Sequence, residues 1–247
     1  MIRKHIPNFI TCLNIVSGSL AVMFALKGGL TISVLLILAA ALFDFFDGMA
    51  ARLLKAYSPI GKDLDSLADM ISFGLAPGMI MFVLLKYSLL GRNIQPGNFS
   101  GVPVWGLIIL SSSLLIPVFS ALRLAKFNID TRQTNSFIGL PTPANAIFIC
   151  SLALIYEFGK YKALDTLLLS SASLLIITLL FSYLLVAEIP MFSLKFKNIS
   201  WQDNKIRIIF LGLALILISV FTFYGIAATI ISFIVLSIIQ NNRKVDK

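Results

Sequence analysis

The sequence predicts an all-α polytopic membrane protein with eight membrane-spanning helices and both termini in the cytoplasm. Of its 247 residues, 58% are hydrophobic and 13% are charged, whereas an ordinary soluble domain is roughly 25% charged. A single globular core could not hide so much apolar surface from water. The composition therefore excludes a soluble enzyme, an intrinsically disordered chain and a nucleic-acid-binding module.

Eight apolar stretches approach the length of about 20 residues that a transmembrane helix needs. The last two are short and form a tight hairpin around Tyr224 and Gly225. No polar linker is long enough to separate domains, so we expect a single integral membrane domain over residues 1–247. The predicted spans are residues 8–26, 29–50, 65–86, 103–122, 143–159, 164–187, 206–222 and 224–241.

Basic residues sort strongly between alternate loops of this eight-span arrangement. Fifteen of the 20 Lys and Arg residues fall at the termini and in the loops on their side. Because cytoplasmic loops of membrane proteins are enriched in Lys and Arg, that side is predicted to face the cytoplasm. The net charge of +9 then needs no nucleic-acid partner, since basic loops face the anionic lipid leaflet. The remaining five are Lys27, Lys86, Arg92, Lys160 and Lys162.

Acidic residues cluster where the second and third predicted spans meet the cytoplasm. Asp44 and Asp47 are three residues apart, and Asp65 and Asp69 are four apart, so each pair shares one helix face. A short connection makes the two helices antiparallel neighbours, and the four carboxylates are expected to converge. Asp63 lies off this face and is interpreted as a loop or helix-start charge.

Oxygen-only ligands suit hard divalent cations, and the single histidine excludes a His-based metal site. We therefore predict Mg²⁺ or Mn²⁺ here, with two ions sharing carboxylates, an arrangement suited to phosphoryl chemistry. Taken singly, such an Asp is usually a helix cap or a solvated residue. Four within 26 positions are hard to attribute to that role.

Small and basic residues lie between the acids. Gly48 and Ala51 leave a notch at which a flat ligand could approach the helix, although small residues in membrane helices usually mark packing. Arg52 suits a bidentate phosphate contact. Taken alone, it would be interpreted as a side chain that extends to the membrane–water interface. Gly61 is expected to permit a tight turn before Asp65.

Together these residues resemble the signature of the CDP-alcohol phosphotransferase family. In that family the four aspartates bind two divalent metals and the last one, here Asp69, acts as general base on the alcohol. The resemblance implies a six-helix core over about residues 6–190, an additional hairpin over about 205–241, and a homodimer. It also implies a nucleotide site made by Gly48, Ala51, Arg52, Gly61, Thr11 and Asn14. The matching pattern is Asp44-x2-Asp47-Gly48-x2-Ala51-Arg52-x8-Gly61-x3-Asp65-x3-Asp69.

Three further stretches, residues 122–128, 137–144 and 189–195, resemble the membrane-embedded phosphatidylserine synthases. This resemblance implies transfer of the phosphatidyl group from CDP-diacylglycerol to L-serine, giving phosphatidylserine and CMP at the cytoplasmic face of the cell membrane. The basic and polar loop after the fourth span offers charges for a zwitterionic acceptor or a phosphate, although such residues also enforce topology or bind lipid phosphate. Its candidate residues are Arg123, Lys126, Asn128, Asp130, Thr131 and Arg132.

Two other functions remain open from the sequence. The same chemistry could use glycerol 3-phosphate or inositol phosphate as the acceptor, with the loop cations binding its phosphate. A divalent-cation transporter could also use membrane carboxylates, but transporter sites tend to lie near the midplane, whereas these acids lie at helix ends. Gly74 and Gly78 form a GxxxG pattern that we expect to serve packing within the fold.

Overall fold

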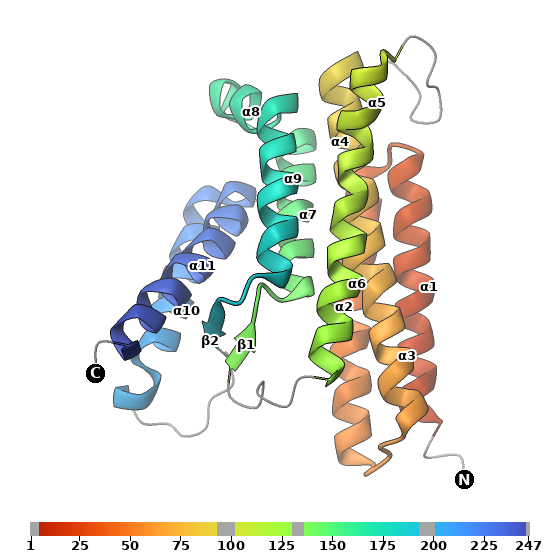
Figure 1. Cartoon of the computed structure of the whole chain (residues 1–247), viewed down its shortest axis with the longest axis vertical. Helices are drawn as coiled ribbons and strands as arrows, with labels where there is room; N and C mark the ends of the chain where they lie inside the picture. Colours follow the sequence, from red (N-terminus) through yellow and green to blue (C-terminus); the bar gives the residue numbers. More distant parts are fainter. Residues whose placement is uncertain (1–4, 93–101, 130–135, 193–200, 246–247) are drawn as a thin grey trace.

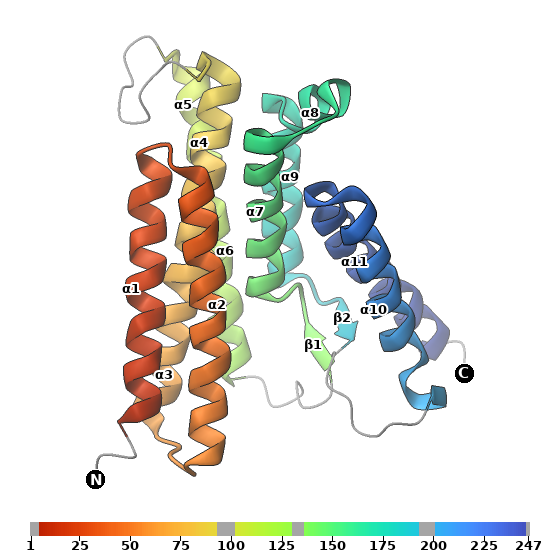
Figure 2. The same ribbon diagram turned by 180° about the vertical axis from the view of Figure 1, so that it is seen from behind.

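The computed structural model describes residues 5–92, 102–129, 136–192 and 201–245, and these are helical apart from one short pair of strands. Figures 1 and 2 show three groups side by side: α1–α6, then α7–α9, then the hairpin α10–α11. The elements are α1 (Ile6–Leu26), α2 (Leu30–Leu53), α3 (Pro59–Asp69), π-helix η2 (Met70–Leu75), α4 (Ala76–Leu90), α5 (Val104–Ser111), 3₁₀-helix η3 (Ser112–Leu114), α6 (Leu115–Ile129), β1 (Ser136–Ile138), α7 (Thr142–Phe158), α8 (Lys162–Leu168), α9 (Ser171–Val186), β2 (Pro190–Phe192), α10 (Trp201–Phe221) and α11 (Phe223–Val245).

The prediction of eight spans is wrong. Within the described residues, six helices are long and apolar enough to cross a membrane, or seven if the bent pair α8–α9 forms one span. Helix α7 has 17 residues, about 25 Å at 1.5 Å per residue, which is less than the roughly 30 Å hydrocarbon core. Helices α8 and α9 meet at 56°, because the chain breaks at Ser170, whose hydroxyl caps α9. The division of Lys and Arg residues between alternate loops assumed an even number of spans. The cytoplasmic orientation of the termini therefore stays a prediction.

Small side chains let α1 and α2 pack closely. Ala21, Ala25 and Ala40 are fully buried, as expected for small residues at a membrane helix interface. Two hydroxyl groups reach across the interface: Ser17 Oγ donates to the carbonyl of Leu36 at 2.8 Å, and Ser33 Oγ donates to that of Ala21 at 2.8 Å. Both helices are therefore held in a fixed register, which positions the acids at the end of α2.

The third helix begins earlier than the sequence analysis expected. Ser58 caps α3, its hydroxyl accepting from the backbone N–H of Gly61 at 3.0 Å, and Pro59 occupies the first helical position, which favours a helix start. Gly61 therefore lies in the first turn of α3 rather than in a tight turn, and that expectation is wrong. Directly after Asp69 the helix widens into η2, a form that occurs frequently at functional sites.

The GxxxG pattern serves packing within the fold, as expected. A Cβ on Gly74 would lie 3.0 Å from Ser120 Cβ, and one on Gly78 would lie 2.9 Å from Pro117 Cδ. Both contacts are made with α6. The glycines therefore let η2 and α4 approach α6 closely, next to the acidic cluster.

A two-stranded antiparallel ribbon joins the start of α7 to the end of α9. Strand β1 pairs with β2, with Phe137 opposite Met191. Gly139 follows with φ of +77°, and a Cβ there would lie 2.5 Å from the carbonyl oxygen of Leu185. Gly139 N–H donates to the Ile189 carbonyl at 3.0 Å. The ribbon thus fixes the N-terminus of α7, which lies beside α6 in Figure 1.

The hairpin α10–α11 packs mainly against α7 and β2. Phe192 of β2 makes edge-on ring contacts with Phe210 and Phe233 at 5.6 and 4.8 Å between centroids. At the other end, Tyr224 Oη donates to Asp165 and accepts from the backbone N–H of Lys160 at 2.9 Å. These contacts lie away from the acidic cluster.

Candidate metal and nucleotide site

Three carboxylates converge at the ends of α2 and α3. One oxygen from each of Asp44, Asp47 and Asp65 lies within 4.8 Å of the other two. The i, i+3 spacing places Asp44 and Asp47 on one face of α2, and α3 returns Asp65 alongside them. Asp47 is buried, and Thr11 Oγ1 of α1 donates to its Oδ2 at 2.7 Å. Asp63 is exposed and lies outside this group.

Asp69 lies one turn beyond Asp65 and is the last residue of α3. Its carboxylate is repelled by those of Asp44, Asp65 and Asp47 and attracted by the guanidinium of Arg123. Oδ1 of Asp69 and Oδ1 of Asp65 are buried and accept no hydrogen bond from any described residue. The structure therefore brings the fourth predicted acid to the edge of the cluster.

The donor set fits divalent cations. Four carboxylates repel one another, and none of them forms a salt bridge found among the described residues, although Arg123 attracts Asp69. Buried anionic oxygens without partners are costly, and carboxylate oxygens alone are the ligands that Mg²⁺ and Mn²⁺ favour. The Asp44, Asp47 and Asp65 group can therefore hold a metal ion.

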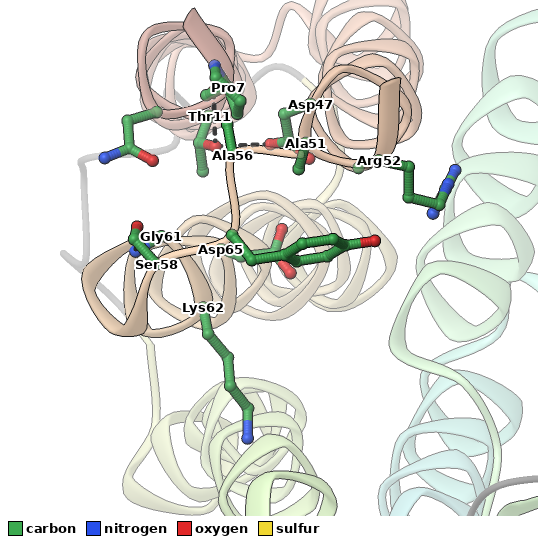
Figure 3. A pocket seen from close by; sticks show the side chains of 13 residues that line it. Pro7, Thr11, Asp47, Ala51, Arg52, Ala56, Ser58, Gly61, Lys62 and Asp65 are labelled. Carbon is green, nitrogen blue, oxygen red and sulfur yellow. Dashed lines mark hydrogen bonds between the residues drawn. The ribbon is translucent and has the colours of Figure 1, made fainter. Parts of the chain in front are cut away.

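A cavity of about 230 Å³ adjoins the carboxylates. Side chains from α1, α2 and α3 line it, and Figure 3 shows Thr11 and Asp47 pointing toward each other while Arg52 extends away from them. Two of the metal-binding candidates, Asp47 and Asp65, also form part of its wall. The predicted nucleotide residues that line it are Thr11, Gly48, Ala51, Arg52 and Gly61.

The two glycines that line this cavity have different surroundings. A Cβ on Gly48 would meet one described atom within 4 Å, Arg52 Nη1 at 3.5 Å, whereas a Cβ on Gly61 would lie 2.9 Å from Ser58 Oγ and 3.1 Å from Asn8 Oδ1. Gly61 therefore allows the capping serine and Asn8 to approach α3. The role of Gly61 is this close approach, not a turn.

Asn14 does not line the cavity, contrary to the sequence-based expectation. It is fully buried, and its Oδ1 accepts from Ser72 Oγ at 2.6 Å. Ser72 belongs to η2, and a Cβ on Gly18 of α1 would lie 2.2 Å from its hydroxyl. Asn14 therefore fixes α1 against the π-helix behind Asp69.

The predicted acceptor residues separate in the structure. Arg123 is buried in α6, whereas Lys126 is exposed. Asn128 Nδ2 donates to Ser66 Oγ of α3 at 2.8 Å, and its carbonyl accepts from Lys62 Nζ at 3.1 Å, so it ties α6 to α3. The other three candidates, Asp130, Thr131 and Arg132, lie outside the described residues.

Sequence reasoning missed several residues of the site. The cavity is also lined by Asn8, Tyr57, Ser58 and Lys62. In the sequence these residues form no cluster of like charges that would indicate a ligand site. The Ser-Pro pair at the start of α3 was a readable helix-start signal and would have placed Ser58 and Gly61 correctly.

The fold and this site together define a class: an integral membrane protein with several spans, whose carboxylate metal site opens beside a cavity at the ends of its first three helices. The sequence model of the family described as CDP-alcohol phosphatidyltransferase matches residues 4–186. The chain belongs to this family, which confirms the resemblance drawn from the motif. It is thus a multi-pass membrane enzyme of phospholipid biosynthesis, and the family's substrates are CDP-diacylglycerol and an alcohol acceptor.

Individual relatives agree with this assignment. A CDP-diacylglycerol–serine O-phosphatidyltransferase of Helicobacter pylori is 30% identical over 253 residues, covering 96% of this chain and 95% of the relative. The enzyme of the same description from Bacillus subtilis is 35% identical over 154 residues, covering 62% of this chain and 78% of the relative. An archaetidylserine synthase of Methanothermobacter thermautotrophicus is 31% identical over 163 residues, or 65% and 61% of the two chains.

Proposed function

We propose that this enzyme transfers the phosphatidyl group from CDP-diacylglycerol to the hydroxyl of L-serine, giving phosphatidylserine and CMP. The observation that carries serine as the acceptor is the similarity to serine transferases, which extends over 96% of the chain for one relative. The archaetidylserine synthase adds support, because its name differs in the lipid and agrees in serine.

The nucleotide end of the lipid occupies the cavity beside α2. Gly48 and Ala51 leave room for the cytidine, Thr11 and Gly61 line the opposite walls, and Arg52 contacts a phosphate. The acyl chains remain among the apolar helices while the head group meets water. A site at helix ends suits this pair of substrates, because one is a lipid and the other is a soluble zwitterion.

Asp44, Asp47, Asp65 and Asp69 are the proposed ligands of two divalent cations, Mg²⁺ or Mn²⁺. Such ions, when bound, neutralise charge on the diphosphate. Asp69 accepts the proton of the serine hydroxyl as its oxygen attacks the phosphorus attached to diacylglycerol. The bond from this phosphorus to the CMP oxygen breaks, CMP leaves, and the proton passes from Asp69 to water.

The site is proposed to face the cytoplasm, and the enzyme is proposed to be a homodimer. The basic residues next to the acids, Arg52, Lys55 and Lys62, support this side, because cytoplasmic loops are enriched in Lys and Arg. Asp63 and Lys160 are both exposed and allow a test, after replacement of Cys12 and Cys150. An impermeant maleimide should label Lys160→Cys in intact cells and label Asp63→Cys only after permeabilisation. The reverse pattern would invert the proposed orientation.

The proposed homodimer has its own test: light scattering in detergent should give the mass of two chains.

An acceptor-specific assay tests the reaction. Purified enzyme should release CMP from CDP-diacylglycerol when L-serine and Mg²⁺ or Mn²⁺ are present, and not when a chelator replaces the metal. Glycerol 3-phosphate and inositol phosphate are the matched alternatives. CMP release with either of these, but none with serine, would overturn the acceptor and leave the family chemistry intact.

A further inference from the structure

Arg123 of α6 and Asn145 of α7 are buried and incompletely hydrogen-bonded, as is Ser120 of α6. Asn145 of α7 is fully buried, and neither its Nδ2 nor its Oδ1 has a hydrogen-bond partner among the described residues. Arg123 of α6 is 7% exposed, and its Nε also lacks a described partner. Because buried polar groups are almost always hydrogen-bonded, two such residues on facing helices point to a ligand.

Arg123 connects the acidic cluster to the face of α7 that carries Asn145. Arg123 Nη1 donates to Thr142 Oγ1 at 3.5 Å, and Thr142 precedes Asn145 by three residues, on the same face of α7. Arg123 is also the cation that attracts Asp69, although the two form no direct salt bridge in the described part of the chain. Its guanidinium lies 5.9 Å from the ring centre of Phe127. Arg123 therefore links the proposed base to the turn of α7 that carries Asn145.

We propose that Arg123 and Asn145 bind the carboxylate and ammonium groups of an amino-acid acceptor whose hydroxyl faces Asp69, a proposal that rests on serine being the acceptor. The free donors, Arg123 Nε and Asn145 Nδ2, match the two oxygens of a carboxylate, and Asn145 Oδ1 accepts from the ammonium group. Thr142 is a positioning residue that orients the guanidinium.

This pair of acceptor-binding residues differs from the set that the sequence predicted in the loop after the fourth span. Lys126 is exposed, and Asn128 is occupied by its hydrogen bond to Ser66. Neither is left with a buried, unpaired group. The selective residues are accordingly contributed by the interior of α6 and the first turn of α7, whose position is set by Gly139 and the β1–β2 ribbon.

The test compares L-serine with serinol, in which a hydroxymethyl group replaces the carboxylate. In CMP-release assays with the full chain, CDP-diacylglycerol and Mg²⁺, Asn145→Ala and Arg123→Gln should each raise the KM for serine about tenfold to a hundredfold. Arg123→Gln should change kcat/KM for serinol by less than about threefold. Asn145→Ala should lower it less than it lowers kcat/KM for serine, because only the ammonium contact is lost with serinol. Both variants should leave the KM for CDP-diacylglycerol unaltered. Ser151→Ala is the matched control, since Ser151 is buried two turns further along α7 and bonds within its own helix.

Asn145→Asp provides a second test should the alanine variant fold poorly. A carboxylate at this position repels that of serine and still accepts from an ammonium group, so serine use should fall while serinol use is retained. Equal losses for serine and serinol, or an unchanged KM for serine in folded variants, would overturn the proposal. Failure of the wild-type enzyme to use serine at all would instead overturn the proposed function, and the inference with it.

Discussion

The acidic end of α1–α3 and the hairpin α10–α11 are constrained very differently. Around the acids, polar side chains join separate helices: Thr11 bonds Asp47 and Asn14 bonds Ser72. In the hairpin, only 11% of the α10 span window is buried, and a Cβ on Gly212 would meet no atom of the described residues within 4 Å. One region is fixed by close polar contacts, whereas the other is largely an apolar surface.

The two regions also differ in their expected contribution to the reaction. The family match covers residues 4–186 and ends with α9, so the proposed chemistry lies within it and the hairpin lies outside. Substitutions near the acids should therefore alter the reaction, whereas comparable changes in the hairpin should alter stability or nothing. Each prediction below tests that contrast.

The largest effect is expected for Asp69→Asn. Loss of a general base costs about a hundredfold to ten-thousandfold in rate, so CMP release should fall by this factor while the amide retains the shape of the side chain. Asp63→Asn is the control, because Asp63 lies on the same helix but is exposed; it should keep wild-type activity.

A measurement of CDP-diacylglycerol binding distinguishes the role of Asp69 as general base from its role as metal ligand. If the Asn variant binds the lipid normally and turns over slowly, the side chain acts on the acceptor. Full turnover by the Asn variant would remove Asp69 as the base, and equal losses in Asp63→Asn would remove the contrast between the cluster and its surface.

A smaller effect is expected for Gly18→Ala. The new methyl group would lie 2.2 Å from Ser72 Oγ and 2.9 Å from Ser72 Cα, so α1 and η2 must separate, at about 1–3 kcal/mol for overpacking. We expect a lower Tm in detergent and reduced activity, because Ser72 lies three residues after Asp69.

The hairpin supplies the matched glycine. Gly212→Ala adds the same methyl group where no described atom lies within 4 Å, and alanine favours a helix over glycine by about 1 kcal/mol. Its Tm should therefore be unchanged or higher, with normal activity. Equal destabilisation by both substitutions would contradict the contrast between the regions.

The sequence predicted the convergence of three acids better than the number of spans. Residue spacing alone placed Asp44, Asp47 and Asp65 together, because helix periodicity fixes which residues share a face. It could not reveal η2 after Asp69, since widening of a helix depends on packing against α1 and α6. Asn145 was overlooked, although a polar residue in an apolar helix is itself a signal of function.

The errors in the spans have local causes. Helix α7 agrees with the predicted residues 143–159 to within one residue, between Pro141 and Gly159, but its 17 residues are fewer than the roughly 20 that a span needs. The cap at Ser170 divides α8 from α9, a break that an averaged hydrophobic window hides.

A still smaller effect is expected for Tyr224→Phe in the hairpin. The hydroxyl accepts from the N–H groups of Lys160 and Tyr161 and donates to Asp165, so its removal should cost about 1 kcal/mol of stability. The KM values for both substrates should not change, because these bonds lie away from the carboxylates. An altered KM for serine would show that the hairpin influences the site.

The smallest effect is expected for Glu157→Gln, at a contact between α7 and the residue pair that follows α4, outside both regions. Arg92, just after α4, donates to Glu157 of α7 at 2.9 Å, and the carboxylate raises the pKa of the guanidinium. The Arg92 side chain is 61% exposed, so water and salt screen the pair, and such pairs contribute about 1 kcal/mol or less. The variant should lose this small amount of stability at low salt and resemble the wild type at high salt, with unchanged activity. A loss as large as that of Gly18→Ala, or one that persists at high salt, would mean that the junction of α4 with α7 is as tightly constrained as the acidic end.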